Sequence, residues 1–208
     1  MQRRNGFTLI ELLIVLAITG IVLALGASGF RAWISNVRVR TAADSIQNGL
    51  QLARGEAVRR NARIQFQLMS SVDDACLLSP ANAAIPSTWV ISFANPAGAC
   101  ATVAVNDAFP VSDLINNPLP QILQARPAEG SQNVVVNAGQ ALFVFNGLGR
   151  LTAAPAANPI AVTNPVAGAC RAAGGNVRCL NVVVTLGGQI RMCDPQLTIT
   201  NAADPQSC

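Results

Sequence analysis

Apolar residues dominate the first thirty positions of the chain, where Leu12–Phe30 carries no charged residue at all. A helix over Phe7–Phe30 is about 36 Å long, which is enough to span a bilayer. The run exceeds the roughly 7–15 apolar residues of a removable signal peptide, so the pattern favours a retained, single-pass membrane helix over that alternative. Arg3 and Arg4 precede the run and Arg31 follows it. This asymmetry gives a weak indication of a cytoplasmic N-terminus and an exported C-terminal part.

The pattern changes after residue 34 to apolar positions spaced by three and four, with polar residues on the other faces. This spacing predicts an amphipathic continuation of the same helix to about Arg60, with Asn61 as its stop signal. The buried face is expected to hold Val39, Ala42, Ala43, Ile46, Leu50, Ala53 and Ala57.

Short apolar runs separated by Pro, Gly and Asn predict the strands that cover this helix. The runs are Ala62–Leu68, Trp89–Ala94, Val134–Val136, Ala141–Phe145, Asn181–Leu186 and Gln189–Met192. Asn146-Gly147 and Gly187-Gly188 are typical hairpin turns and suggest a meander. The segments Asn95–Gly130 and Thr152–Gly175 have no clear pattern and are expected to be loops. The predicted fold class is α+β, with a long N-terminal helix packed on an antiparallel sheet.

Composition argues against an enzyme. The chain has no histidine, and all fourteen basic residues are arginine, so His-assisted hydrolysis and lysine Schiff-base chemistry are excluded. Gly147-Leu148-Gly149 does not extend into a dinucleotide-binding motif. We therefore expect no cofactor and no catalytic residues.

The six cysteines point to disulfide bonds in an exported head. Sequence alone does not choose among the possible connectivities, but sequential pairing is the simplest. Metal ligation is disfavoured because no Cys-x2–4-Cys spacing and no histidine occur. The sequential pairs are Cys76–Cys100, Cys170–Cys179 and Cys193–Cys208.

Glu11 is an acidic residue near the start of an otherwise apolar segment. A carboxylate in this position is costly unless it reaches the membrane–water interface or has a partner. The segment Gly6–Leu16 around it resembles the prepilin signature of type IV pilins and type II secretion pseudopilins. The resemblance implies cleavage by prepilin peptidase after Gly6 and N-methylation of Phe7. It also implies that Glu11 meets the N-terminal amine of a neighbouring subunit during filament assembly.

These implications divide the chain into a leader peptide (1–6), a transmembrane and filament-core helix (7–30), and a head (31–208) that includes the rest of the helix. The resemblance places the protein in the inner membrane with its head in the periplasm, and on the pilus surface after assembly. The implied partners are other pilins, prepilin peptidase and the inner membrane.

Two further segments resemble the FimT and GspH group of minor pilins and pseudopilins. Leu50–Asn61 is similar to the end of the first helix in that group, although Glu56 and Arg60 also fit an ordinary surface ion pair. Gly187–Pro195 is similar to a C-terminal motif whose two arginines are implicated in DNA binding during natural transformation. Arg191 occupies the second arginine position, whereas Gln189 replaces the first.

Global charge does not attract DNA, because after loss of Arg3 and Arg4 twelve arginines face ten acidic residues, a net charge of +2. A local site is expected if residues at or beside the predicted hairpins converge. The candidate residues are Arg150, Arg178, Gln189 and Arg191. The competing interpretation is that these arginines are solvated loop charges or protect a sheet edge. The sequence thus predicts a FimT-like minor pilin that acts in pilus assembly and could bind double-stranded DNA, with a GspH-type pseudopilin as the alternative.

Overall fold

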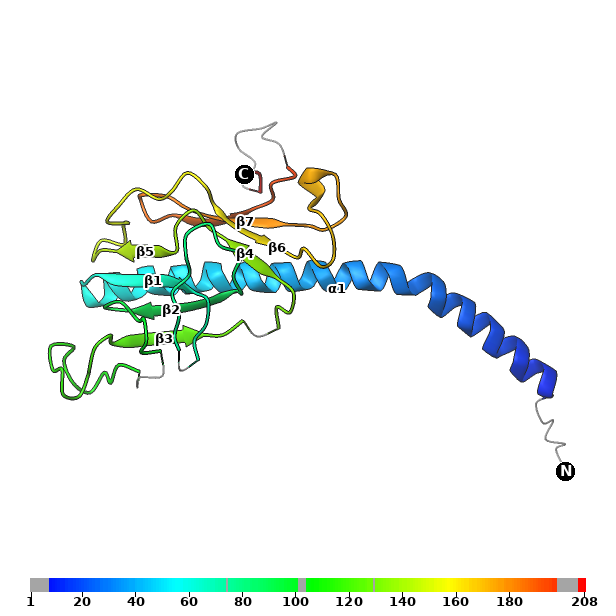
Figure 1. Cartoon of the computed structure of the whole chain (residues 1–208), viewed down its shortest axis with the longest axis horizontal. Helices are drawn as coiled ribbons and strands as arrows, with labels where there is room; N and C mark the ends of the chain where they lie inside the picture. Colours follow the sequence, from blue (N-terminus) through cyan, green and yellow to red (C-terminus); the bar gives the residue numbers. More distant parts are fainter. Residues whose placement is uncertain (1–7, 74, 101–103, 129, 198–205) are drawn as a thin grey trace, which may run out of the picture.

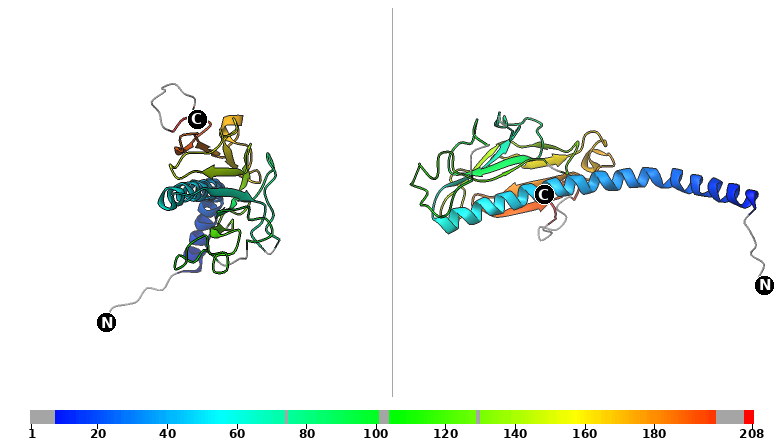
Figure 2. Two further views of the ribbon diagram at one scale, coloured as in Figure 1. Left: turned by 90° about the vertical axis from the view of Figure 1, so that its left-hand side faces the viewer. Right: turned by 90° about the horizontal axis from the view of Figure 1, so that it is seen from below.

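A single helix, α1 (Leu9–Arg60, 52 residues), runs through the molecule, as the periodicity predicts. A computed structural model describes residues 8–73, 75–100, 104–128, 130–197 and 206–208 of the chain. The helix begins after Thr8, whose side chain caps it, and ends at Asn61, whose left-handed conformation (φ 48°) stops it as expected. The first half of α1 projects away from the head and the second half lies along it (Figures 1 and 2). Among the described residues, no helix is both long enough and apolar enough to cross a membrane, so the predicted span over 7–30 is not confirmed.

The head contains two antiparallel four-stranded sheets in place of the single sheet that the sequence predicts. In the first sheet, called sheet A here, the order is β3 (Ile122–Arg126), β2 (Thr88–Ser92), β1 (Ile64–Met69) and β5 (Leu142–Phe145). In sheet B, the order is β4 (Val135–Asn137), β6 (Ile160–Thr163), β7 (Leu180–Val184) and β8 (Ile190–Cys193). Of the two predicted hairpins, the one at Gly187-Gly188 is confirmed, because it joins the paired strands β7 and β8. Across Asn146-Gly147 only a single bridge forms, between Phe145 and Leu151, so the predicted second strand of that hairpin is absent from the described residues.

Strands β3 and β6 lie in the two segments expected to be loops, which corrects that expectation. Each is short and lies between prolines: Pro120 and Pro127 flank β3, and Pro159 and Pro165 flank β6. Proline has no amide hydrogen to donate, so such flanks suggest a loop. Here the prolines lie outside the paired residues, and the strands form through pairing with β2 and β7.

Both sheets contact the second half of α1, and its predicted apolar stripe is buried in one continuous core. The Phe66 ring packs against the rings of Trp89 and Phe143 on sheet A. On sheet B, Val162, Val182 and Val184 lie in the same core. The two sheets together cover the stripe, which gives α1 a fixed position relative to the head.

Three disulfide bonds join the cysteines in sequential order, in agreement with the simplest pairing. Cys76–Cys100 links the segments that follow β1 and β2, with Cα atoms 5.3 Å apart. Cys170–Cys179 closes a loop that contains the short 3-10 helix η1 (Arg171–Ala173). Cys193–Cys208 ties the C-terminal residues to β8.

Candidate functional site

The N-terminal processing residues Gly6 and Phe7 lie outside the described residues, so their predicted roles stay predictions. Glu11 is described, and its carboxylate accepts hydrogen bonds from the Thr8 backbone N–H (2.9 Å) and the Thr8 hydroxyl (3.0 Å). The Glu11 N–H donates in return to the Thr8 hydroxyl (3.3 Å). This capping box is a local partner that the sequence analysis did not identify.

The first half of α1 exposes large apolar side chains on every side of the helix. Each has at least half of its surface open: Leu9, Ile10, Leu12, Leu13, Ile14, Val15, Leu16, Ile18, Ile21, Val22 and Leu23. A helix that is apolar all round requires an apolar environment, either lipid or other helices. The head supplies neither, so this half of α1 is the main uncovered apolar surface among the described residues.

Two of the four predicted DNA-binding residues are held by other groups in the head. The Arg178 guanidinium donates to the buried carboxylate of Asp194 at 2.8 Å. Arg191 donates to the Ser207 carbonyl at 2.9 Å. Both side chains therefore position neighbouring segments of sheet B.

The other two residues, Arg150 and Gln189, are exposed and lie on two turns that contact each other. Gly188 approaches the Gly149 carbonyl so closely that a Cβ atom at Gly188 would collide with it. Arg178 precedes β7 and Gln189 follows its far end, so roughly 15 Å of strand separates them. The structure therefore brings Arg150 and Gln189 together but leaves Arg178 at the opposite end of the sheet, so the four residues do not converge on one site.

Two further arginines surround the Asn146–Leu151 turn and were missed in the sequence analysis. Arg54 of α1 donates to the Gly149 carbonyl at 3.2 Å. Arg63 precedes Ile64, which pairs with Phe145 immediately before the turn. Arg54, Arg63 and Arg150 are exposed, and we call them the turn arginines. Only the pairing of β1 with β5 brings Arg63 to this turn, and it joins Ile64 to Phe145, 81 positions away, so no local sequence pattern reveals it.

Glu56 and Arg60 form the expected ion pair (2.8 Å), but it belongs to a larger network and is not a simple surface pair. Arg59 also donates to Glu56 (2.7 Å), and both arginines contact Asp107. Burial raises the pKa of Glu56, but hydrogen bonds from Arg59 and Arg60 outweigh this effect and hold it below its ordinary value. A hydrogen bond from Arg60 lowers the pKa of Asp107. The network thus fastens the loop over residues 104–118 to the end of α1.

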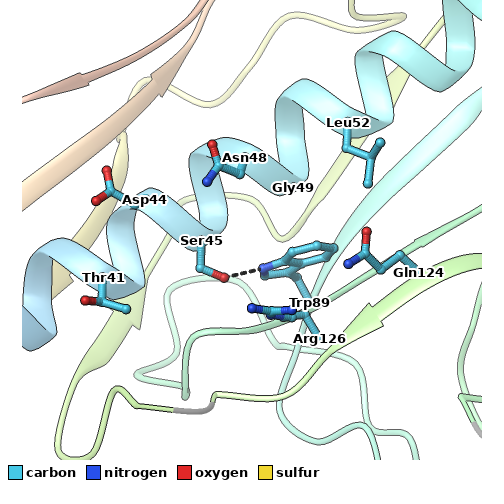
Figure 3. A pocket seen from close by; sticks show the side chains of 9 residues that line it. All are labelled: Thr41, Asp44, Ser45, Asn48, Gly49, Leu52, Trp89, Gln124 and Arg126. Atoms are coloured by element: carbon cyan, nitrogen blue, oxygen red, sulfur yellow. Dashed lines mark hydrogen bonds between the residues drawn. The ribbon is translucent and has the colours of Figure 1, made fainter.

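A groove of about 390 Å³ lies between α1 and strands β2 and β3 (Figure 3). Trp89 stands between its walls, and its indole N–H donates to the Ser45 hydroxyl at 3.1 Å. Asp44 and Arg126 lie on opposite sides of the groove. Within the described ranges, no three cysteine, aspartate or glutamate side chains are grouped as metal ligands would be.

Comparison with known families places the chain in a defined class. Residues 1–27 match the prokaryotic N-terminal methylation motif, and residues 42–188 match the family described as type II transport protein GspH. Because the second match covers well over half of the chain, the protein belongs to the GspH family.

Two solved structures are similar to this chain, both of the type IV minor pilin FimU from Pseudomonas aeruginosa PAO1 in different crystal forms. The sequence identities are 17% and 18%, and each match covers 76% of this chain. The matches cover 97% and 92% of the FimU chains, with a TM-score of 0.45 in each case. A search of curated proteins gives no match.

Proposed function

We propose that the protein is a minor pilin of a type IV pilus, anchored in the inner membrane before assembly with its head in the periplasm. The observation that carries this proposal is the first half of α1, whose large apolar side chains are exposed on every side. Neighbouring pilin helices would cover these side chains in a filament. The prokaryotic N-terminal methylation motif over residues 1–27 supports prior processing by prepilin peptidase.

Glu11 has a specific role in this proposal. Its carboxylate is already oriented by Thr8, and it would accept the N-terminal amine of the neighbouring subunit in the filament core. An ion pair is tolerated in an apolar core when both charges are matched and hydrogen bonded. The capping box therefore orients the Glu11 carboxylate but leaves its negative charge unpaired and available to the amine.

The test is incorporation into pili sheared from cells that express full-length variants. Glu11→Gln, which retains the shape but removes the charge, should abolish incorporation. Thr8→Ala, which removes the cap but retains the carboxylate, should leave most incorporation intact. Normal incorporation of Glu11→Gln would contradict the role given to the carboxylate.

A second proposed activity is weak, sequence-independent binding of double-stranded DNA by the turn arginines. The exposed guanidinium groups of Arg54, Arg63 and Arg150 around one turn support it. Three phosphate contacts give a salt dependence of log K with a slope between about −2 and −3. Titration of the processed full-length protein in detergent against DNA at two salt concentrations would measure this slope. Binding that does not change with salt, or no binding at low salt, would contradict the proposal.

The alternative is a pseudopilin of a type II secretion system, which the description of the matching family supports. The two functions differ in physiology. Deletion of the gene should impair pilus-dependent functions if the protein is a minor pilin. A block in exoprotein secretion with normal pili would identify the pseudopilin instead.

A further inference from the structure

A second cavity lies at the base of the head, where α1 leaves the two sheets. It measures about 340 Å³, is partly open to solvent, and lies between α1 and the segment 166–177. The helix contributes Arg31 and Ser35, and the segment contributes Val166 and Asn176. Figure 1 shows this segment, drawn in orange with the short helix η1, beside α1 at the point where the helix emerges. Its volume lies within the range of pockets that take small ligands, about 300–1,000 Å³.

Ser35 presents a buried hydroxyl that lacks a partner. The residue is 6% exposed, and its Oγ is the one buried side-chain polar atom among the described residues without a hydrogen bond. Buried polar groups are normally paired, and an unpaired one lowers stability. The side-chain amide oxygen of the neighbouring Asn36 accepts a hydrogen bond from the Arg178 backbone N–H at 3.0 Å, so Asn36 has a partner whereas the Ser35 hydroxyl has none. Ser35 lines the cavity but its Oγ is fully buried, so its side chain would have to turn toward a bound ligand to gain this partner.

The charge beside this hydroxyl is positive. Arg31 stands one turn before Ser35 on the same face of α1, about 6 Å along the axis. It is exposed, and within the described part of the chain it forms no ion pair. Arg171 lies near the same rim and donates to the Asn176 carbonyl at 3.4 Å. Of the described residues that line the cavity, none is acidic. A free guanidinium and an unpaired hydroxyl favour an anion with several acceptor oxygens.

The residues around the cavity are of the kinds that are enriched at membrane interfaces. Arg31 is the first charged residue after the uncharged run Leu12–Phe30. Phe30 and Trp33, on either side of it, are about 60% exposed and stack with ring centroids 5.8 Å apart. Val166 at the rim is 75% exposed. Tryptophan is enriched at the headgroup level of membrane proteins, where arginine and lysine also act as anchors.

We propose that this cavity binds the phosphate of an anionic phospholipid headgroup. Arg31 supplies the charge-assisted hydrogen bonds, and the Ser35 hydroxyl donates one more. Phe30, Trp33 and Val166 contact the acyl boundary. The bound lipid would fix the depth of the head at the membrane before assembly. This site is separate from the turn arginines and from Glu11, so it goes beyond the functions proposed above.

The experiment measures binding of short-chain phosphatidylglycerol to the processed full-length protein in a non-ionic detergent. The comparison ligands are short-chain phosphatidylcholine and inorganic phosphate. The variants are Arg31→Gln and Ser35→Ala, and Arg40→Gln is the matched control. Arg40 is an exposed cation of the same helix that pairs with Asp44 and does not line the cavity.

Phosphatidylglycerol should bind more tightly than phosphatidylcholine, whose choline cation is repelled by Arg31. Arg31→Gln should weaken its binding about tenfold or more, and Arg40→Gln less than about twofold. Ser35→Ala should weaken binding about fivefold and yet raise the Tm of the lipid-free protein, because an unsatisfied hydroxyl is removed. A purely structural serine would not produce this opposite pair of changes.

Four results would overturn the proposal. Equal losses in Arg31→Gln and Arg40→Gln would indicate general charge attraction. Equal affinity for the two lipids would exclude recognition of an anionic headgroup. Equal affinity for inorganic phosphate would indicate a site for a free ion. Unchanged lipid binding in Arg31→Gln, with lost association with partner pilins, would identify a protein contact instead.

Discussion

The Arg191 guanidinium donates a 2.9 Å hydrogen bond to the Ser207 carbonyl, next to the disulfide bond between Cys193 and Cys208. The Asp194 N–H, directly after β8, donates to the Gln206 carbonyl at 2.8 Å. The C-terminal residues are therefore held against β8 by a covalent bond, a backbone contact and an arginine. Arg191 thus holds the C-terminal residues in this structure, and the DNA-binding role that its motif suggests stays a prediction.

Replacing Cys193 and Cys208 by serine should lower the free energy of unfolding by about 3 kcal/mol. The reason is that the bond closes a loop of 15 residues, and its loss restores conformational freedom to the unfolded chain. Urea unfolding of the full-length protein measures the change. Reduced wild-type protein loses all three disulfide bonds and should therefore unfold at a still lower urea concentration than the variant. A change below about 1 kcal/mol would show that Arg191 and the backbone contacts hold the tail without the disulfide bond.

Substitutions at Arg178 and Arg150 should affect different properties of the protein, stability in the first case and DNA binding in the second. Arg178→Met leaves the Asp194 carboxylate, only 8% exposed, without its cation, so the free energy of unfolding should fall by about 1–2 kcal/mol. DNA affinity should not change. Arg150→Met should leave stability unaltered and lower the salt slope of DNA binding by about 1. Filter binding at several salt concentrations and urea unfolding provide the two measurements, and a loss of DNA binding in Arg178→Met would contradict this assignment.

The sequence identifies the elements of this fold better than their pairing. The boundaries of α1 follow from its periodicity and from Asn61, and six strands follow from short apolar runs. The division into two sheets does not follow, because β1 pairs with β5 across more than seventy residues. Local patterns carry no information about such pairs.

Local patterns also do not reveal long-range contacts at the candidate sites, which explains why only some of the site residues were predicted. The turn residues Arg150 and Gln189 could be selected from their hairpins, but Arg54 and Arg63 reach the turn only through the packing of α1 and β1. The sequence also does not predict that the Ser35 hydroxyl lacks a partner, since a serine hydroxyl on a helix normally hydrogen-bonds to water or to a backbone carbonyl. The segment that buries it is more than 120 residues away in the sequence.

Acidification should release the loop over residues 104–118. The pKa of Asp107 is lowered by the hydrogen bond from Arg60, and that of Glu56 is also below its ordinary value. A lowered folded-state pKa stabilises the fold above the unfolded pKa, and the contribution is lost as pH falls through the folded value. The ordinary values are near 4, so the loss should occur below about pH 4.

Hydrogen exchange of the loop amides, read by mass spectrometry after incubation at pH 7 to 3, measures this release. Asp107→Asn should reduce protection of the loop at pH 7 and flatten the dependence on pH. Asp113→Asn is the control, because Asp113 bonds within the loop to Asn116 and not to α1. Loop protection that persists unchanged to pH 3 in the wild-type protein would contradict a fastening role for the network.

Two glycines of α1 should respond to alanine in opposite directions. A Cβ atom at Gly49 would lie 2.8 Å from Phe66 and 2.9 Å from Trp89, closer than these rings allow. Gly49→Ala should therefore lower the free energy of unfolding by about 1–3 kcal/mol through overpacking. A Cβ atom at Gly55 meets nothing within 4 Å, so Gly55→Ala should raise it by about 1 kcal/mol through helix propensity. Urea unfolding measures both changes. Because helix propensity alone would stabilise both variants equally, a stabilised Gly49→Ala would contradict the tight packing of α1 on Trp89.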